Sequence, residues 1–243
     1  MGIYLNPDYT EFYNAVKYSK IYVDKTELIA YTNSVLYGEQ RNICVSRPRR
    51  FGKSMAANML VAYYSRGCDS RELFQNLKIA QHPSFSEHLN KYNVIHINML
   101  DELTESETVS DMMTTLKKKL LWELEEEYGD IRCYDWNDLV MVMKTIHNKT
   151  GQQFVIIIDE WDCLFREYQN DTNAQKEYLD FLRFWMKGKS YLTLAYMTGI
   201  LPIKKYGKHS ALNMFDEYSM TNQSYLAEFT GFTEQEVKEL CEK

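Results

Sequence analysis

Two stretches of this chain carry residue types suited to binding a polyphosphate and a metal ion. Residues 47–54 are Arg-Pro-Arg-Arg-Phe-Gly-Lys-Ser, and residues 154–160 form an apolar run that closes on Asp159 and Glu160. A Gly-Lys-Ser ending is the second half of a phosphate-binding loop, in which the lysine reaches the β- and γ-phosphates and the serine hydroxyl binds Mg²⁺. An apolar strand that ends in carboxylates supplies further ligands for such a metal. Together, in this order, the two stretches predict a nucleotide-phosphate site.

The phosphate loop departs from the usual pattern at its first position. That pattern has glycine at both ends of a four-residue spacer, whereas this chain has Arg47 first and Gly52 second. The side chain of Arg47 occupies the corner where glycine would let the backbone turn tightly. Backbone N–H groups after Gly52 would still open a helix whose N-terminus favours phosphate. The alternative is a basic turn that only caps a helix. The predicted nucleotide contacts in this loop are Pro48, Arg49, Arg50, Phe51, Gly52, Lys53, Ser54 and Met55.

The two carboxylates have different predicted roles. Residues 155–158 are β-branched without alternation, which favours a central parallel strand, and ligands bind at the carboxyl ends of such strands. Asp159 is therefore predicted to hold Mg²⁺ together with Ser54, and Glu160 to be the general base that activates water. Asp162 follows closely and could share the cation. The alternative is that these acids only begin a solvated loop.

Further polar candidates follow the next expected strand, residues 191–198. Thr198 could sense a γ-phosphate beside the loop and is included among the predicted nucleotide contacts, although a strand-end turn at Gly199 explains these residues equally well. Lys204 and Lys205 could supply charge to a transition state, as an arginine finger does. Most lysines are simply solvated, so both interpretations of these two lysines stay open.

Composition limits the class of protein. The 243 residues are 45% hydrophobic with a net charge of −6, which is enough for a packed core and gives no overall basic field for nucleic acid. Positive charge gathers instead at residues 47–53, which suits a compact polyanion. The five cysteines include no CxxC pair, and the five histidines show no metal-ligand spacing. Nothing in the sequence resembles a signal peptide or a membrane span, so we expect a cytoplasmic protein with reduced thiols.

Strands and helices are expected to alternate along the chain. Strands are predicted at 43–45, 93–99, 154–158 and 191–198, and helices at 55–64, 106–128, 138–147 and 173–187. Another helix should run from Asp24 to Tyr31, beginning with a capping box formed by Asp24 and Glu27. This alternation predicts an α/β fold of three layers around a mainly parallel sheet.

Several stretches together resemble the bacterial AAA-ATPase-like family. They are residues 22–26, 47–54, 158–162, 198–207, 210–213 and 229–237. Arginine in place of the first loop glycine is a trait of that group. The resemblance implies a P-loop ATPase core at residues 1–226, including an N-terminal wrapping segment, that uses ATP and Mg²⁺. Lys53 and Glu160 would carry catalysis, and residues 227–243 would begin a helical lid.

The resemblance also implies partners for this core. Family members often continue into a helical region and a restriction-endonuclease-like nuclease domain, so we expect the chain to stop inside its first lid helix as a truncated product. A neighbouring subunit could also complete the site. Two functions stay open. One is a Mg²⁺-dependent ATPase or nucleotide switch that uses Glu160 as its base. The other is an inactive nucleotide-binding or interaction module whose Arg-rich loop docks an acidic partner or a nucleic-acid backbone.

Overall fold

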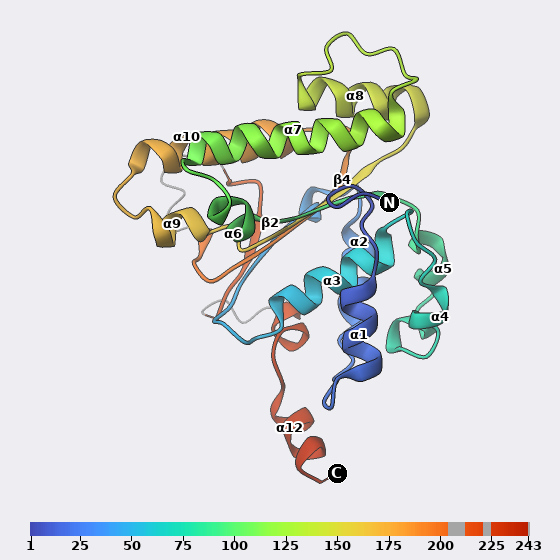
Figure 1. The fold of residues 1–243 in the computed structure, drawn as a ribbon. Coiled ribbons are helices and arrows are strands. Elements are labelled where there is room, and N and C mark those ends of the chain that lie inside the picture. The colour runs from blue at the N-terminus through green and yellow to red at the C-terminus, as the bar shows by residue number, and fades with distance from the viewer. Residues whose placement is uncertain (204–211, 221–224, 243) are drawn as a thin grey trace.

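A sheet of parallel strands lies at the centre of the molecule (Figure 1). The computed structural model describes residues 1–203, 212–220 and 225–242. The strands are β1 (Asn42–Ser46), β2 (Asn93–Asn98), β3 (Phe154–Asp159), β4 (Leu192–Gly199) and β5 (Asp216–Tyr218). Their order in the sheet is β2-β3-β4-β1-β5, and each pairing of these strands is parallel. The predicted α/β fold with a parallel central sheet is confirmed.

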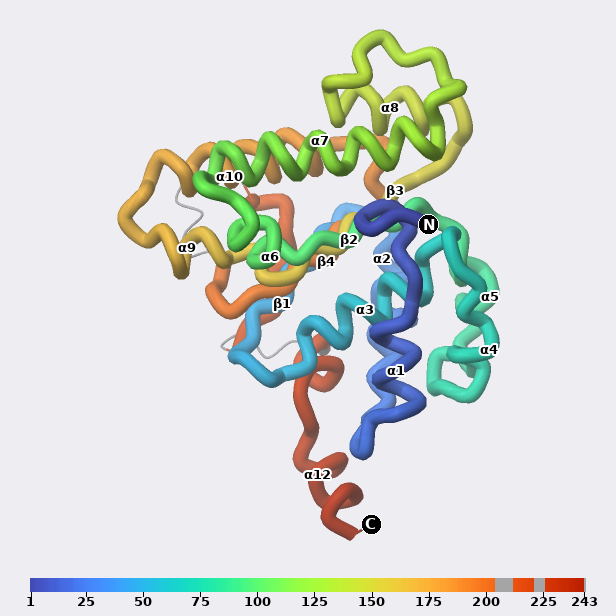
Figure 2. Tube along the Cα trace, viewed as in Figure 1, coloured from blue at the N-terminus to red at the C-terminus, as the bar shows by residue number. Residues whose placement is uncertain are grey.

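Helices cover both faces of the sheet, because parallel strands need crossover connections (Figure 2). One face carries α1 (Thr10–Tyr18), α2 (Glu27–Val35), α3 (Lys53–Tyr64), α4 (Arg71–Phe74) and α5 (Phe85–His88). The other carries α6 (Met99–Thr104), α7 (Val109–Tyr128), α8 (Leu139–Thr150), α9 (Cys163–Glu167) and α10 (Thr172–Met186). The short 3₁₀ helices are η1 (Glu39–Arg41), η2 (Lys78–Gln81) and η3 (Tyr225–Phe229), and α12 (Glu234–Cys241) lies near the C-terminus. The three predicted layers are present.

Two hydrophobic cores form, one on each face of the sheet, because side chains alternate along a strand. In β3, Val155 and Ile157 pack into the core under α3, whereas Ile156 and Ile158 pack into the core under α7. This double burial explains the β-branched run without alternation. Within the described part of the chain, no helix is both long and apolar enough to cross a membrane.

The long helices agree with their predicted periodicity. The apolar residues at helical spacing on α7 are buried: Met113, Leu116, Leu120, Leu124 and Tyr128. On α10 the buried residues include Tyr178, Phe181, Leu182 and Trp185. Side-chain caps start both helices, since Thr108 accepts a hydrogen bond from the Asp111 N–H and Asp171 accepts one from the Ala174 N–H. Gly188 takes a positive φ of 65° after the end of α10, the conformation expected of a glycine that terminates a helix.

The capping box predicted at Asp24 and Glu27 is wrong. The Asp24 carboxylate accepts hydrogen bonds from the N–H and hydroxyl of Thr26 and from the N–H of Lys78. Asp24 therefore ties the start of α2 to η2, and Thr26, the residue before α2, makes no side-chain cap. The box forms instead at α12, where Thr233 and Glu236 bond reciprocally.

The carboxyl ends of the central strands bring polar residues together. Asn98 of β2 lies in register with Asp159 of β3, and Thr198 of β4 donates a hydrogen bond to the Asp159 carboxylate. Since β4 lies between β1 and β3, Thr198 stands between Asp159 and the loop that follows β1. By alternation from Ile157, Asp159 belongs to the face that α3 covers. The loop after β1 and the Asp159 carboxylate therefore lie at the same edge of the sheet and on the same face.

Candidate functional site

The loop after β1 turns into α3 through two residues with positive φ. Arg50 has a φ of 69° and Gly52 a φ of 72°, and Gly52 is followed directly by Lys53, the first residue of α3. A left-handed conformation costs a residue with a side chain about 1–2 kcal/mol, so glycine suits position 52. The first N–H groups of a helix have no intrahelical partner. The turn at Gly52 therefore leaves the first N–H groups of α3 beside the loop, without intrahelical partners.

A cleft of about 390 Å³ opens in front of this helix terminus. Its walls come from the loop, the start of α3 and the ends of β2 and β3. The lining residues are Arg49, Arg50, Gly52, Lys53, Ser54, Met55, Asn98, Leu100, Asp159, Glu160 and Arg166. The structure thus gathers most of the predicted site residues, whereas Pro48, Phe51 and Thr198 do not line this cleft.

Lys53 lies inside the cleft with much of its bonding capacity unused. The residue is only 5% exposed, and its Nζ donates to the carbonyl of Pro48 at 3.1 Å. Within the described residues, no carboxylate lies within ion-pair distance of this ammonium group. Since an ammonium carries three N–H donors, two remain for an anion. Pro48, a predicted nucleotide contact, holds the lysine through its carbonyl.

Asp159 presents one occupied and one free oxygen. The residue is 4% exposed, and its Oδ1 accepts hydrogen bonds from the Thr198 hydroxyl and, at 2.9 Å, from the Glu160 N–H. No described residue donates a hydrogen bond to Oδ2. A fixed carboxylate with one free oxygen is the kind of ligand that Mg²⁺ takes. The Thr198 hydroxyl orients this carboxylate.

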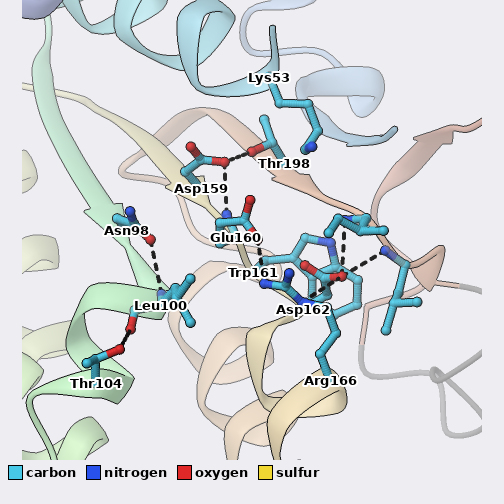
Figure 3. Close-up of polar contacts among 12 residues, drawn as sticks. Lys53, Asn98, Leu100, Thr104, Asp159, Glu160, Trp161, Asp162, Arg166 and Thr198 are labelled. Atoms are coloured by element: carbon cyan, nitrogen blue, oxygen red, sulfur yellow. Dashed lines mark hydrogen bonds and ion pairs between the residues drawn. The ribbon is translucent and has the colours of Figure 1, made fainter. Parts of the chain in front are cut away.

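Glu160 and Asp162 point to different partners (Figure 3). Glu160 has a φ of 52°, and its carboxylate pairs with Arg166 of α9 at the edge of the cleft. Asp162 is fully buried, and its Oδ2 accepts from the N–H groups of Ile200 and Leu201 at 3.0 and 2.8 Å. The expectation that Asp162 shares a cation with its neighbours is therefore not met.

A metal ion would need ligands from outside the protein as well. Across residues 1–203, 212–220 and 225–242, no group of three or more His, Cys, Asp or Glu side chains is arranged to hold a metal. Ser54 and Asp159, which both carry side-chain oxygens, line the cleft. Mg²⁺ commonly binds through one or two protein oxygens and completes its shell with phosphate and water. The donor set therefore fits Mg²⁺ that arrives with a phosphate ligand.

Arg47 does not face the cleft. It is 4% exposed, its N–H donates to the carbonyl of Gly199 at 3.0 Å, and its Nε donates to the hydroxyl of Thr230 at 3.2 Å. Burial lowers the pKa of Arg47. Close by, the Gly231 N–H donates to the carbonyl of Phe51 at 2.8 Å. The side chain that replaces the first loop glycine is thus used to fasten the C-terminal segment to the loop.

The sequence matches the family model AAA-ATPase_like, described as Predicted AAA-ATPase, over residues 8–208. The chain belongs to this AAA-ATPase-like family. None of the curated proteins matches it. Among solved structures, C. elegans PCH-2 is similar with a TM-score of 0.36 and 14% identity, over 87% of this chain and 46% of that one. The chain thus spans less than half the length of that structure, and the fold assignment rests on the strand topology described above.

A second cavity in this AAA-ATPase-like chain adjoins the cleft. It encloses about 430 Å³ and shares Arg50, Gly52 and Met55 with the cleft. The other lining residues are mainly apolar and come from both ends of the chain: Phe12, Ser19, Ile21, Tyr22, Val23, Lys25, Phe51, Ala56, Met59, Phe229, Gly231 and Phe232. We name this cavity the apolar pocket.

One polar atom in the apolar pocket has no partner. The Tyr22 hydroxyl is buried without a hydrogen bond, and its pKa is raised, mainly by burial and also by the nearby Asp24. At one side of the pocket, Lys25 donates to both carboxylate oxygens of Glu236 and to the carbonyl of Glu228. The pocket thus combines mainly apolar walls with a buried hydroxyl that has no hydrogen-bond partner among the described residues.

Sequence reasoning missed three residues of the site. Asn98 ends β2 beside Asp159, and the end of that predicted strand was the available signal. Arg166 follows Asp162 by four residues, so helical spacing after the acidic cluster could have indicated it. No local signal places Tyr22 against the loop, because that contact is long-range. Lys204 and Lys205 lie outside the described residues.

Proposed function

We propose that this chain binds ATP together with Mg²⁺ and hydrolyses it to ADP and phosphate. The observation that carries the proposal is the convergence of Lys53, Ser54, Asp159 and Glu160 on one cleft at the mouth of a helix N-terminus. These residues come from two elements that are far apart in sequence. Each of them has a chemical group that suits one part of a metal-bound triphosphate.

The charges in the cleft match a triphosphate. The free donors of Lys53 and the first N–H groups of α3 would contact phosphate oxygens. Ser54 and Asp159 would hold Mg²⁺, which neutralises charge on the phosphates when it is bound. Glu160 is the carboxylate at the edge of the cleft, and it would accept a proton from the attacking water. Membership of the AAA-ATPase-like family supports the same assignment.

The apolar pocket gives the nucleoside a place. It adjoins the phosphate cleft at Gly52 and Met55, so a ligand lying across both cavities would have its phosphates at Lys53 and its base among aromatic side chains. Aromatic and aliphatic walls suit a planar base. The Tyr22 hydroxyl is the buried polar group that would bond to it. This arrangement favours a nucleotide over an inorganic polyphosphate.

The segment that begins near residue 227 would act as the cover of this nucleotide site. Arg47 bonds to Thr230, and Phe51 bonds to Gly231 through its carbonyl. Since Phe229 and Phe232 line the apolar pocket, displacement of the segment would open one wall of it. We therefore divide the chain into a core of residues 1–226 and a cover that starts at 227.

A second candidate function is docking without catalysis. Arg49 and Arg50 are exposed at the mouth of the cleft, and neither forms an ion pair with any described residue. Such a pair of cations could hold an acidic partner or a nucleic-acid backbone. Binding of that kind weakens steeply with salt, whereas Mg²⁺-ATP held in a buried cleft is expected to be less sensitive.

Calorimetric titration tests the proposal. We expect saturable Mg²⁺-ATP binding by the wild type, a loss of about 100-fold or more in Lys53→Ala because a charged hydrogen-bond donor is removed, and no change in Lys149→Ala, which alters an exposed lysine on α8. A phosphate-release assay then compares the wild type with Glu160→Gln, which should keep binding and lose release. If the wild type does not bind ATP or does not release phosphate from it, the proposed hydrolysis is wrong. If Glu160→Gln releases phosphate at the wild-type rate, Glu160 is not the base.

A further inference from the structure

Arg166 touches Glu160, the carboxylate to which the proposed function assigns proton transfer. It belongs to α9, its side chain is 13% exposed, and its Nη2 bonds to Oε2 of Glu160. The residue also lines the cleft. Figure 3 shows Arg166 meeting Glu160 from the side of α9, while Lys53 and Thr198 lie on the opposite side of the carboxylate. The contact with Arg166 therefore lies on the side of Glu160 away from Lys53.

Only one oxygen of Glu160 is used in this contact. No described residue donates a hydrogen bond to Oε1. The backbone of Glu160 is also held, since its N–H bonds to Asp159 and its φ is 52°. A glutamate side chain has three rotatable bonds, so a base on such a chain needs outside contacts to keep one geometry. Arg166 supplies such a contact and leaves the second oxygen for a water molecule.

Asp162 forms a second, longer ion pair with Arg166, without a hydrogen bond to its Nε. Its Oδ2 lies 3.7 Å from the Nε of Arg166, one helical turn away on the same segment. The same oxygen accepts the N–H groups of Ile200 and Leu201, which follow β4, so Asp162 itself is fixed. Planar guanidinium groups can contact two carboxylates at once through their five donors. A continuous set of polar contacts thus joins the end of β4 to Glu160 through Asp162 and Arg166.

We propose that Arg166 is a positioning residue that fixes the carboxylate of Glu160 for attack of water on the terminal phosphate. This inference rests on the proposed function and deepens it. In the same view, Asp162 acts as the support of Arg166 and not as a metal ligand. The competing role is direct contact of Arg166 with the nucleotide, which would change affinity for ATP as well as the rate.

Steady-state hydrolysis and equilibrium binding separate these roles. Arg166→Ala should lower kcat about 10- to 100-fold, because a hydrogen bond to a charged group is lost, while the dissociation constants of ATP and ADP stay within about twofold. Arg166→Lys should recover part of the rate, since it restores a donor without the planar fork. Added guanidinium ion should partly restore Arg166→Ala. Arg132→Ala, which removes an exposed arginine, serves as the matched control.

A double variant tests whether Arg166 acts through Glu160. In the Glu160→Gln background, Arg166→Ala should give no further loss of rate, because residues that act as a unit are not additive. Circular dichroism and thermal unfolding would show that both single variants fold. Full additivity of the two losses, or a fall in ATP affinity that matches the fall in kcat, would overturn the positioning role.

The two proposals fail in different ways. Absence of phosphate release from the wild type would overturn the proposed hydrolysis, and this inference with it. Release by the wild type that is lost in Glu160→Gln but unchanged in Arg166→Ala would overturn this inference alone. An Arg166→Ala variant that binds ATP normally, hydrolyses it slowly and responds to guanidinium supports both.

Discussion

The phosphate cleft and the apolar pocket meet at Gly52 and Met55, yet they are built in opposite ways. Most residues that line the cleft are polar, and they come mainly from the loop after β1, the first turn of α3 and the ends of β2 and β3. The apolar pocket is lined partly by the loop and the first turns of α3, and partly by segments near residues 22 and 230 that are far apart in the sequence. Strand pairing fixes the cleft, whereas a few contacts between distant segments fix the pocket.

Their difference in construction predicts a difference in robustness. The cleft rests on a sheet with hydrophobic cores on both faces, so polar substitutions there should change ligand binding more than folding. Among the described residues, three sets of polar contacts hold the C-terminal segment at the pocket: Arg47 with Thr230, Phe51 with Gly231, and Lys25 with Glu236 and Glu228. Such contacts can open locally at low cost in free energy. Substitutions at the pocket should therefore alter the C-terminal segment first.

Among the substitutions that compare the two cavities, Asp159→Asn should produce the largest effect, and this effect should be confined to the cleft. The amide keeps an acceptor for Thr198 and removes the charge that would hold Mg²⁺. We expect Mg²⁺-ATP affinity to fall about 10- to 100-fold, the usual effect of losing a bond to a charged group. Titrations with Mg²⁺ and with EDTA measure this, and the two proteins should bind alike in EDTA.

Asp101→Asn is the control for that comparison, because Asp101 is an acid on the neighbouring α6 that does not line the cleft. Adenosine should bind Asp159→Asn as it binds the wild type if the pocket holds the nucleoside separately. If Asp159→Asn loses as much affinity for adenosine as for ATP, the two cavities do not bind the nucleoside and the phosphates separately.

The same contrast explains what the sequence could predict. Gly52, Lys53, Asp159 and Glu160 lie within local patterns, an apolar run followed by a loop or a carboxylate, and the structure brings these residues to one cleft. The β-branched run of residues 155–158 also predicted a central strand, and all of its residues are buried. Local patterns succeed here because the carboxyl ends of parallel strands share one edge of the sheet.

Other features depend on partners that no local pattern contains. The acid at Asp24 matched a capping box, but Lys78 and Thr26 use its carboxylate. The position of Asp162 after Asp159 and Glu160 suggested a third metal ligand, but its carboxylate accepts hydrogen bonds from the N–H groups that follow β4. The sequence did not show why arginine replaces the first loop glycine at position 47. Its Nε donates a hydrogen bond to Thr230, which is far along the chain. In each case a long-range hydrogen bond decided the role of a charged side chain.

Gly231→Ala should open the apolar pocket. Gly231 has a φ of 78°, and an added Cβ would lie 2.8 Å from the Phe51 ring. The left-handed backbone alone costs alanine about 1–2 kcal/mol, and Phe51 must also move. Chemical denaturation should show the loss of stability, and adenosine affinity should fall while affinity for inorganic triphosphate is kept.

Gly188→Ala is the matched control for this substitution. Gly188 has a similar φ of 65°, but nothing lies within 4 Å of its added Cβ. It should therefore lose stability through the backbone alone and keep normal adenosine binding. If Gly188→Ala weakens adenosine binding as much as Gly231→Ala does, contact with Phe51 is not what shapes the pocket.

Tyr22→Phe should have a smaller effect, with opposite signs for folding and binding. A buried hydroxyl without a partner is costly, so its removal should stabilise the free protein by about 1 kcal/mol. If that hydroxyl bonds to the base, ATP affinity should fall about fivefold, the equivalent of one hydrogen bond. Thermal unfolding and titration with ATP measure the two effects.

Tyr196→Phe separates the two effects of Tyr22. Tyr196 of β4 also has a buried hydroxyl without a partner, but it does not line the apolar pocket. This variant should gain stability and keep its ATP affinity. If ATP binding is weakened in Tyr196→Phe but not in Tyr22→Phe, the base does not bind in the apolar pocket.

Glu236→Gln should have the smallest effect, because its ion pair with Lys25 is partly exposed, with side-chain exposures of 16% for Lys25 and 19% for Glu236. Glutamine at this position still supports the capping box with Thr233, so the substitution isolates the charge. Burial opposes ionisation of Glu236, but the hydrogen bonds from Lys25 and Thr233 outweigh it and lower its pKa. We expect the free energy of unfolding to fall by less than about 1 kcal/mol at neutral pH.

The pH dependence of that loss tests whether the charge is its cause. A carboxylate whose pKa is lowered by folding stabilises the protein above its ordinary pKa of 4.5, and it loses that contribution as the pH falls through the lowered folded value. The difference in unfolding free energy between wild type and Glu236→Gln should therefore be full at pH 7 and vanish below the lowered pKa. Limited proteolysis of α12 should follow the same course, with Lys25→Met behaving like Glu236→Gln at pH 7. A difference that persists undiminished in acid would mean that shape, and not the ion pair, holds α12 beside Lys25.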